Sequence, residues 1–253
     1  MYSNMQKYVS EMLGTAVLIL FGCGVVAMVV IFSNPSYVIV NGGYTNIVLG
    51  WGFAVTFGCY VASISGAHLN PAVTFSLCLI GKSAWSHLPV YFTAQMLGAM
   101  TGSLLVWMSY KPHFNITKDA SSILSCFCTQ PAIRNYPWNL FCELLATAVL
   151  TLGILGILDT NNHLGSGIGP ISIGFLIASL LLSLGGATGV AINPARDLGP
   201  RLMHAFLPIP SKQSSDFAYS WIPVIAPFIG GAIGALVYKY CLNTLAPLKA
   251  FIE

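Results

Sequence analysis

Long apolar stretches follow one another along almost the whole chain, separated by short polar connections. A helix needs about 20 mostly apolar residues to cross a bilayer, and six stretches reach or approach that length. They cover residues 9–31, 45–64, 88–110, 140–158, 168–184 and 221–242. This pattern predicts an all-α integral membrane protein with six membrane-spanning helices.

Two further apolar runs, residues 73–80 and 198–207, are too short to span a bilayer. Each follows an Asn-Pro-Ala tripeptide, at Asn70-Pro71-Ala72 and at Asn193-Pro194-Ala195. Proline suits the first turn of a helix because it lacks the N–H that would be unpaired there. We therefore expect Asn70 and Asn193 to be the N-caps of two half-helices that begin inside the membrane. Exposed N–H groups at that depth must face protein or a water-filled path, so the pair predicts a polar pathway.

The chain also repeats internally. Glu11 and Thr15 recur as Glu143 and Thr147, and the pair Gly98 and Gly102 recurs as Gly230 and Gly234. Each half holds three predicted spans, an odd number, so the second half must be inserted upside down relative to the first. We expect one channel domain over residues 1–253, with repeats at about 8–110 and 138–242 and a connection at 111–137. The paired glycines have the spacing that allows helices to approach closely.

Composition agrees with the membrane interpretation. Hydrophobic residues make up 56% of the chain and charged residues only 7%, far below the roughly 25% charged content of a soluble domain. The net charge of +3 is too small to indicate a nucleic-acid partner. Positive charges divide evenly between the two predicted sides of the membrane, so charge alone does not orient the chain.

Segments 65–73 and 189–201 read Ser-Gly-Ala-His-Leu-Asn-Pro-Ala-Val and Gly-Val-Ala-Ile-Asn-Pro-Ala-Arg-Asp-Leu-Gly-Pro-Arg. With the six spans, they resemble the signature loops of the aquaporin and glycerol-facilitator family, the major intrinsic proteins, over about residues 11–240. Several positions resemble the glycerol-conducting branch of that family, the aquaglyceroporins. These are Asp197, Arg201, Tyr110 and the pair Pro223-Val224.

The resemblance implies six transmembrane helices and two re-entrant half-helices in an inverted repeat. It also implies a passive channel for glycerol, water and other small neutral solutes such as urea, which excludes protons and ions. No enzymatic activity, cofactor or resident metal is expected. The family pattern further implies a homotetramer in the lipid bilayer of the plasma or cell membrane, with both termini in the cytoplasm.

The residues of the two motifs fit such a pore. The amides of Asn70 and Asn193 can donate to a passing hydroxyl or water, and both helix dipoles present positive ends there. An intramembrane arginine such as Arg196 indicates function because its desolvation is expensive. Its fixed N–H donors suit hydroxyl groups and its charge repels cations. A structural role, with Arg196 pinned by loop carbonyls, accompanies this one.

Three more residues complete the expected selectivity filter. The resemblance places Trp51 as an aromatic wall opposite Arg196, which requires a one-residue deletion near Ala62-Ser63, since an ungapped count reaches Gly50. A membrane-interface anchor is the alternative for Trp51. Val190 stands where well-known bacterial glycerol facilitators have Phe, and Leu181 where glycerol channels have Gly and water channels His. Leu181 excludes the water-only filter, but its bulk offsets the space that Val190 releases, so the sequence leaves the pore diameter open.

Other polar residues are expected to support the motif loops. Glu11 and Glu143 occupy matched positions, which favours acceptance of hydrogen bonds from the irregular loops over a proton relay. His68 is expected to orient its loop, with gating as the weaker alternative, and Gln95 to support a loop. Cys126 and Cys128 are the only closely spaced cysteines, a weak metal signal without further ligands, and are expected to be loop or core thiols.

Four alternative classes compete with a glycerol and water pore. A water-selective aquaporin with a narrow filter is the first. A coupled secondary transporter shares inverted repeats and broken helices, but normally needs an ion site or titratable pair in its pathway, and only Arg196 and Asp197 qualify. An intramembrane enzyme needs a nucleophile beside a base, for which no motif is present. An ion channel is disfavoured because the lumenal charge is positive.

Overall fold

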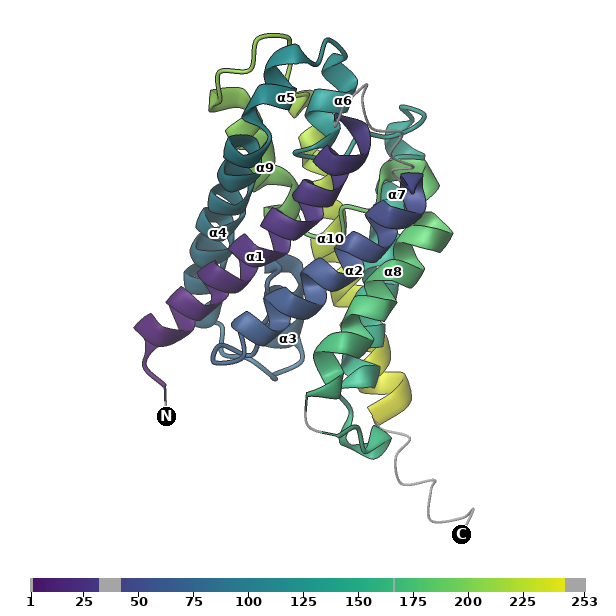
Figure 1. Cartoon of the computed structure of the whole chain (residues 1–253). Coiled ribbons are helices and arrows are strands. Elements are labelled where there is room, and N and C mark those ends of the chain that lie inside the picture. The colour runs from purple at the N-terminus through teal and green to yellow at the C-terminus, as the bar shows by residue number, and fades with distance from the viewer. Residues whose placement is uncertain (1, 32–41, 166, 244–253) are drawn as a thin grey trace.

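Six long helices dominate the computed structural model, which describes residues 2–31, 42–165 and 167–243. They are α1 (Asn4–Val30), α2 (Gly43–Val61), α4 (His87–Ser109), α7 (Tyr136–Ile157), α8 (Ile168–Thr188) and α10 (Phe217–Val237) (Figure 1). Shorter elements are α3 (Pro71–Leu79), α5 (Lys111–Ile116), α6 (Ala120–Ser125), α9 (Pro194–Phe206), the 3₁₀ turn η1 (Thr160–Asn162) and the π-helix η2 (Tyr238–Asn243). The predicted fold class, with six spans and two half-helices, is confirmed.

The long helices differ in how apolar they are. Within the residues that the structure describes, four stretches are suited by length and composition to cross a membrane: α1, α7, α8 and the continuous segment Phe217–Leu242 that begins with α10. Helices α2 and α4, with 19 and 23 residues, are long enough but include polar residues such as Asn46 and Gln95. Gln95 is fully buried, so at least this polar group faces protein rather than lipid.

The two halves of the chain pack their helices in equivalent pairs. Helix α1 contacts α4, and α7 contacts α10. A Cβ atom added to Gly98 would stand 2.3 Å from the Met12 carbonyl oxygen, and one added to Gly230 would stand 2.1 Å from that of Leu144. Gly102 and Gly234 approach the carbonyls of Ala16 and Ala148 in the same way. The predicted close approach at the repeated glycines is present, and only glycine permits it.

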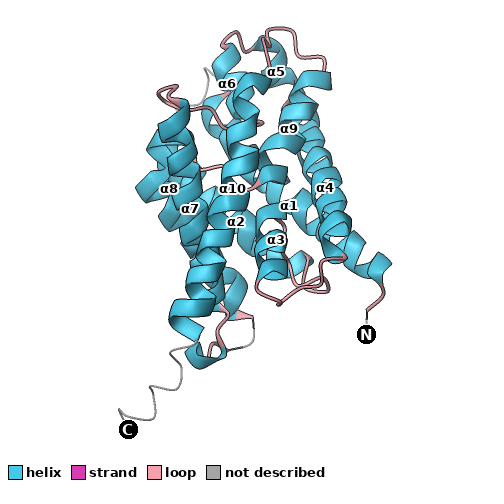
Figure 2. Cartoon of the chain, turned by 180° about the vertical axis from the view of Figure 1, so that it is seen from behind, coloured by secondary structure: helices cyan, strands magenta, loops and turns pink. Residues whose placement is uncertain are grey.

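The half-helices α3 and α9 lie in opposite halves of the molecule, with their N-termini near its centre (Figure 1). Asn70 and Asn193 are their N-caps, and Pro71 and Pro194 occupy the first turn, as predicted. Around them, α3 packs against α4 and α10, and α9 packs against the same two helices. Viewed from behind, α10 crosses the middle of the molecule and covers this junction (Figure 2).

The connection between the two halves folds over one end of the bundle. Helices α5 and α6 lie there beside the end of α9, opposite the start of α1 and the end of α10 (Figures 1 and 2). Phe127 and its neighbours Cys126 and Cys128 are almost completely buried, and both cysteines are free thiols. Burial raises the pKa of the Cys126 thiol well above its ordinary value, so this thiol is an inert core group.

Candidate functional site

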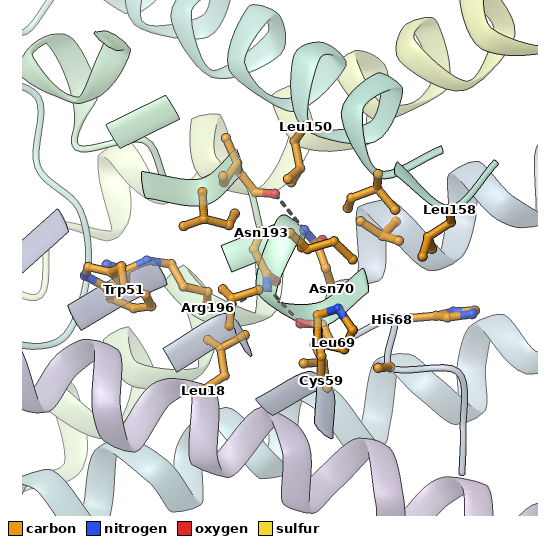
Figure 3. Close-up of a pocket in the computed structure, with 18 of the residues that line it drawn as sticks. Leu18, Trp51, Cys59, His68, Leu69, Asn70, Leu150, Leu158, Asn193 and Arg196 are labelled. Carbon is orange, nitrogen blue, oxygen red and sulfur yellow. Dashed lines mark hydrogen bonds between the residues drawn. The ribbon is translucent and has the colours of Figure 1, made fainter. Parts of the chain in front are cut away.

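A cavity of about 460 Å³ runs along the centre of the bundle, between the two motif loops and helices α2, α7 and α8. Figure 3 shows part of its lining, with the two capping asparagines at its middle. The structure brings seven of the residues singled out from the sequence together in its wall: Trp51, His68, Asn70, Leu181, Val190, Asn193 and Arg196. The cavity is therefore built from both repeats.

The two asparagines clasp one another's loops. The Asn70 amide nitrogen donates to the Ile192 carbonyl, and the Asn193 amide nitrogen donates to the Leu69 carbonyl, each at 2.8 Å (Figure 3). Their side-chain oxygens accept from the backbone of their own half-helices, at Ala72 for Asn70 and at Ala195 for Asn193. A carboxamide carries two N–H groups, so the clasp uses one in each asparagine. The second N–H of each is the group available to a solute.

The loops that precede the asparagines are held in strained backbone. Ala67 and Leu69 have φ values of 53° and 52°, and Val190 and Ile192 have 50° and 45°. Residues with side chains rarely adopt this left-handed region, and β-branched residues least of all. Such strain persists only where the surroundings enforce it, and it clusters at functional sites.

Glu11 supplies that enforcement in the first loop. Its fully buried carboxylate accepts hydrogen bonds from the Ser65 hydroxyl at 2.7 Å and from the backbone N–H groups of His68 and Leu69 at 2.8 Å. The Gln95 amide donates to the same carboxylate at 2.9 Å. Four donors therefore converge on one acidic side chain, which satisfies its acceptor capacity without water.

Glu143 holds the second loop in an equivalent way. Its carboxylate accepts from the Thr188 hydroxyl at 2.6 Å, and from the backbone N–H groups of Ala191 and Ile192 at 3.0 and 2.9 Å. It is 1% exposed and receives three donors instead of four. The position equivalent to Gln95 in the second repeat is Pro227, which has no donor to offer.

Arg196 and Trp51 lie in direct contact. The guanidinium carbon is 4.1 Å from the centroid of the Trp51 ring, and Nη1 donates to the Phe127 carbonyl at 3.2 Å. The prediction that these side chains lie on opposite walls of the pore is therefore wrong. Cation–π attraction and the hydrogen bond to the Phe127 carbonyl hold them on one wall. Gly22 makes room for the ring, since an added Cβ would stand 2.3 Å from it.

The structure also separates Trp51 from its neighbour Gly50. Trp51 is 6% exposed and lines the cavity, whereas a Cβ added to Gly50 would stand 2.5 Å from the Val25 side chain of α1. Gly50 therefore faces the α1–α2 contact. This geometry favours the alignment with a deletion near Ala62-Ser63, and a ring buried over Arg196 is not an interfacial anchor.

Leu181 and Val190 complete the wall near Arg196. Both side chains are buried and line the cavity, with exposed fractions of 6% and 4%. Leu181 belongs to α8, and its backbone carbonyl accepts a hydrogen bond from the Tyr44 hydroxyl at 2.9 Å. Val190 belongs to the strained loop before the second half-helix. The wall thus combines one cationic side chain with aromatic and aliphatic surfaces.

His68 lines the other half of the cavity. Its Nδ1 lies 3.1 Å from the Thr74 hydroxyl, and its ring meets the Tyr91 ring at a centroid distance of 4.9 Å. Gln95 donates to the same Thr74 hydroxyl at 3.2 Å. These contacts tie His68 to α3 and α4, in keeping with the expected orienting role.

The five residues that resemble the glycerol-conducting branch do not line the cavity: Asp197, Arg201, Tyr110, Pro223 and Val224. Asp197 and Arg201 form a fully buried ion pair one helical turn apart on α9. Asp197 also accepts from the backbone and hydroxyl of Thr129, and Arg201 also donates to the carbonyls of Thr129, Ser215 and Asp216. The pair therefore braces α9, and Asp197 lies outside the pathway.

Some residues that line the cavity were not predicted from the sequence. Lys82 lines the end of the cavity remote from Arg196, and Cys59 lines it near Leu69 (Figure 3 shows Cys59). Phe127 matters through its backbone carbonyl, which carries no sequence signal. Lys82 could have been found, because it lies two residues after the short run that follows the first Asn-Pro-Ala and is the only lysine of the 65–85 segment.

Comparison with known proteins agrees with this geometry. The family model described as major intrinsic protein matches residues 1–238. The chain is 50% identical over 237 residues to a probable glycerol uptake facilitator protein of Thermotoga maritima, covering 93% of this chain and 99% of the relative. It is 45% identical over 236 residues to the glycerol uptake facilitator protein of Bacillus subtilis, covering 93% and 84%. The X-ray structure of the aquaglyceroporin from Plasmodium falciparum superposes with a TM-score of 0.86 at 32% identity, covering 97% of this chain and all of the other.

Proposed function

The chain belongs to the major intrinsic protein family, and we infer from this membership and from its pore that it is a passive channel conducting glycerol and water. The observation that carries the inference is the clasp of Asn70 and Asn193 at the middle of a cavity lined by both repeats. The protein is an integral membrane channel and not an enzyme. The water-selective and coupled-transporter alternatives receive no support from the comparisons.

We propose that Trp51, Leu181, Val190 and Arg196 form the selectivity filter. Their side chains give a solute an apolar surface for its carbon chain and N–H donors for its hydroxyl groups. Because Arg196 is stacked on Trp51, the carbon chain of glycerol passes beside this pair rather than between its members. The remaining N–H groups of Asn70 and Asn193 donate to the hydroxyl or water oxygen at the centre.

The proposed basis of cation exclusion is positive potential at the filter and at the middle of the pathway. No acidic side chain occurs among the described residues that line the cavity, whereas Arg196 and Lys82 line its opposite ends. The N-termini of α3 and α9 add two positive helix ends at the middle. A cation would lose its hydration shell without gaining a negative charge as a partner, whereas a neutral polyol has no charge to desolvate.

We further propose a homotetramer in the cell membrane, with both termini in the cytoplasm and the two repeats forming one channel domain. The start of α1 and the end of α10 lie at the same end of the bundle, as that orientation requires (Figure 1). An apolar groove on α1 and α2, with Phe21, Gly24 and Phe53 in its wall, supports the assembly by offering a surface for another helix.

Stopped-flow light scattering on proteoliposomes tests the function directly. Vesicles are challenged with an impermeant osmolyte and, separately, with glycerol. We expect fast shrinkage with the osmolyte, and fast re-swelling with glycerol that does not saturate with concentration. Fast shrinkage without glycerol re-entry would show a water-selective filter, and saturable uptake driven by an ion gradient would show a carrier.

A further inference from the structure

Two filter residues stand on helices that touch along a seam. Trp51 belongs to α2 and Leu181 to α8, and these helices pack against each other. Next to Trp51, a Cβ added to Gly52 would stand 2.9 Å from the Gly174 carbonyl oxygen, and one added to Gly174 would stand 2.6 Å from that of Gly52. The two helices therefore approach closely at Gly52 and Gly174, where the Thr56 hydroxyl also packs against Gly174, and the position of α8 on α2 sets the separation of the two filter residues.

Three of the hydrogen bonds between α2 and α8 lie at different positions along their contact. The Tyr60 hydroxyl donates to the Gly167 carbonyl at 2.7 Å, and the Thr56 hydroxyl lies 3.3 Å from the Pro170 carbonyl. Both acceptors lie more than two turns of α8 away from Leu181. At the other end, the Tyr44 hydroxyl donates to the carbonyl of Leu181 itself, at 2.9 Å. Of these three hydrogen bonds, only the one from Tyr44 has the backbone of a filter residue as its acceptor.

Gly185 makes the Tyr44 contact possible. It lies one turn beyond Leu181 on α8, and an added Cβ would stand 1.8 Å from the Tyr44 hydroxyl oxygen. Any larger residue at position 185 would displace the hydroxyl from the Leu181 carbonyl. Tyr44 and Gly185, 141 positions apart, are therefore complementary halves of one contact.

We propose that Tyr44, seated on Gly185, is a positioning residue that fixes Leu181 relative to Trp51 and thereby sets the largest polyol that the filter admits. This rests on the proposed filter. Tyr44 is outside the cavity lining and half-exposed, so it acts through the backbone of Leu181 and not by contact with the solute. Loss of the bond frees this part of α8 to move away from α2, which widens the filter.

The test is the size selectivity of Tyr44→Phe in proteoliposomes. Permeabilities to glycerol and to the four-carbon polyol erythritol are measured on the same vesicles, so that their ratio does not depend on how much channel is folded. We expect the erythritol-to-glycerol ratio to rise about fivefold, the factor that corresponds to the free energy of one typical hydrogen bond. A purely structural role would lower both permeabilities together and leave the ratio unchanged.

Two further variants sharpen the result. Gly185→Ala displaces the Tyr44 hydroxyl without removing a polar group, so it should raise the ratio as well, and its effect should shrink in the Tyr44→Phe background because the hydroxyl that it collides with is gone. Ser179→Ala is the matched control, because it removes a hydroxyl-to-carbonyl hydrogen bond on the exposed face of α8, onto Phe175 and outside the cavity lining, and it should leave the ratio at the parent value.

The outcomes separate this inference from the function on which it rests. If the parent protein conducts no glycerol, the proposed function fails. If the parent conducts glycerol but Tyr44→Phe keeps its erythritol-to-glycerol ratio, or Ser179→Ala changes the ratio equally, the positioning role of Tyr44 is overturned. Should Gly185→Ala not fold, Tyr44→Phe and Ser179→Ala decide the question by themselves.

Discussion

The guanidinium carbon of Arg196 lies 4.1 Å from the centroid of the Trp51 ring, so the cationic and the aromatic elements of the proposed filter form one stacked unit. The stack is held from outside by the Phe127 carbonyl, which accepts from the arginine at 3.2 Å. A charge fixed in this way keeps its position as solutes pass, which is a requirement for reproducible selectivity.

Replacing the arginine tests its role in excluding charge. Arg196→Ala removes the fixed positive charge from one end of the cavity, and we expect proton leak through the folded channel to rise about tenfold or more. The measurement is the decay of a pH gradient across proteoliposomes containing a pH-sensitive dye. Arg196→Lys is the matched control, because it keeps the charge, and should leak less than the alanine variant. An Ala variant that reaches the membrane without leaking would remove Arg196 from the barrier.

Leu181 is predicted to limit glycerol more than water. Leu181→Gly removes an apolar side chain from the cavity wall and should raise glycerol permeability by about threefold or more while water permeability changes less. Both permeabilities are measured by stopped-flow light scattering on the same preparation. An equal change in both would place the narrowest point elsewhere. Leu182→Gly is a suitable control, since Leu182 is 63% exposed on the outer face of the same helix.

The two loop-holding glutamates should be needed for folding. Glu143→Gln replaces one acceptor oxygen with an NH₂ group that confronts the N–H groups of the loop, and should lower stability by about 2–4 kcal/mol. Glu11→Gln should be worse, because Glu11 receives four donors and Glu143 three. Thermal unfolding in detergent measures both. A proton-relay role would instead leave stability intact and abolish a pH-driven flux.

The buried ion pair of α9 should matter for stability and not for selectivity. Asp197→Asn leaves Arg201 charged, buried and without its carboxylate partner, which should cost about 3–5 kcal/mol. Since Asp197 does not line the cavity, the channels that fold should keep the parent ratio of glycerol to water permeability. Thermal unfolding and stopped-flow permeability are measured together. An altered ratio of glycerol to water permeability with unchanged stability would show that Asp197 acts in the pathway.

Local signals accounted for much of the fold. The apolar stretches gave the six spans, and the Asn-Pro steps gave the half-helix starts at Asn70 and Asn193, because a cap and a first-turn proline are properties of adjacent residues. The repeated glycines gave the close helix pairs for a similar reason, since backbone contact demands the same residue type at each place. The boundaries moved by at most five residues.

The sequence by itself determined that this protein is an all-helical channel of two inverted repeats, because span length, capping and duplication are written in consecutive or evenly spaced residues. The tertiary structure alone decided which side chains share the pathway. It stacked Arg196 on Trp51 and paired Asp197 with Arg201 outside the pore. It also showed that Lys82 lines the cavity, that the Phe127 carbonyl holds Arg196, and that Tyr44 bonds the Leu181 carbonyl. These contacts join residues tens of positions apart, and several run through backbone carbonyls, which every residue possesses and no sequence pattern distinguishes.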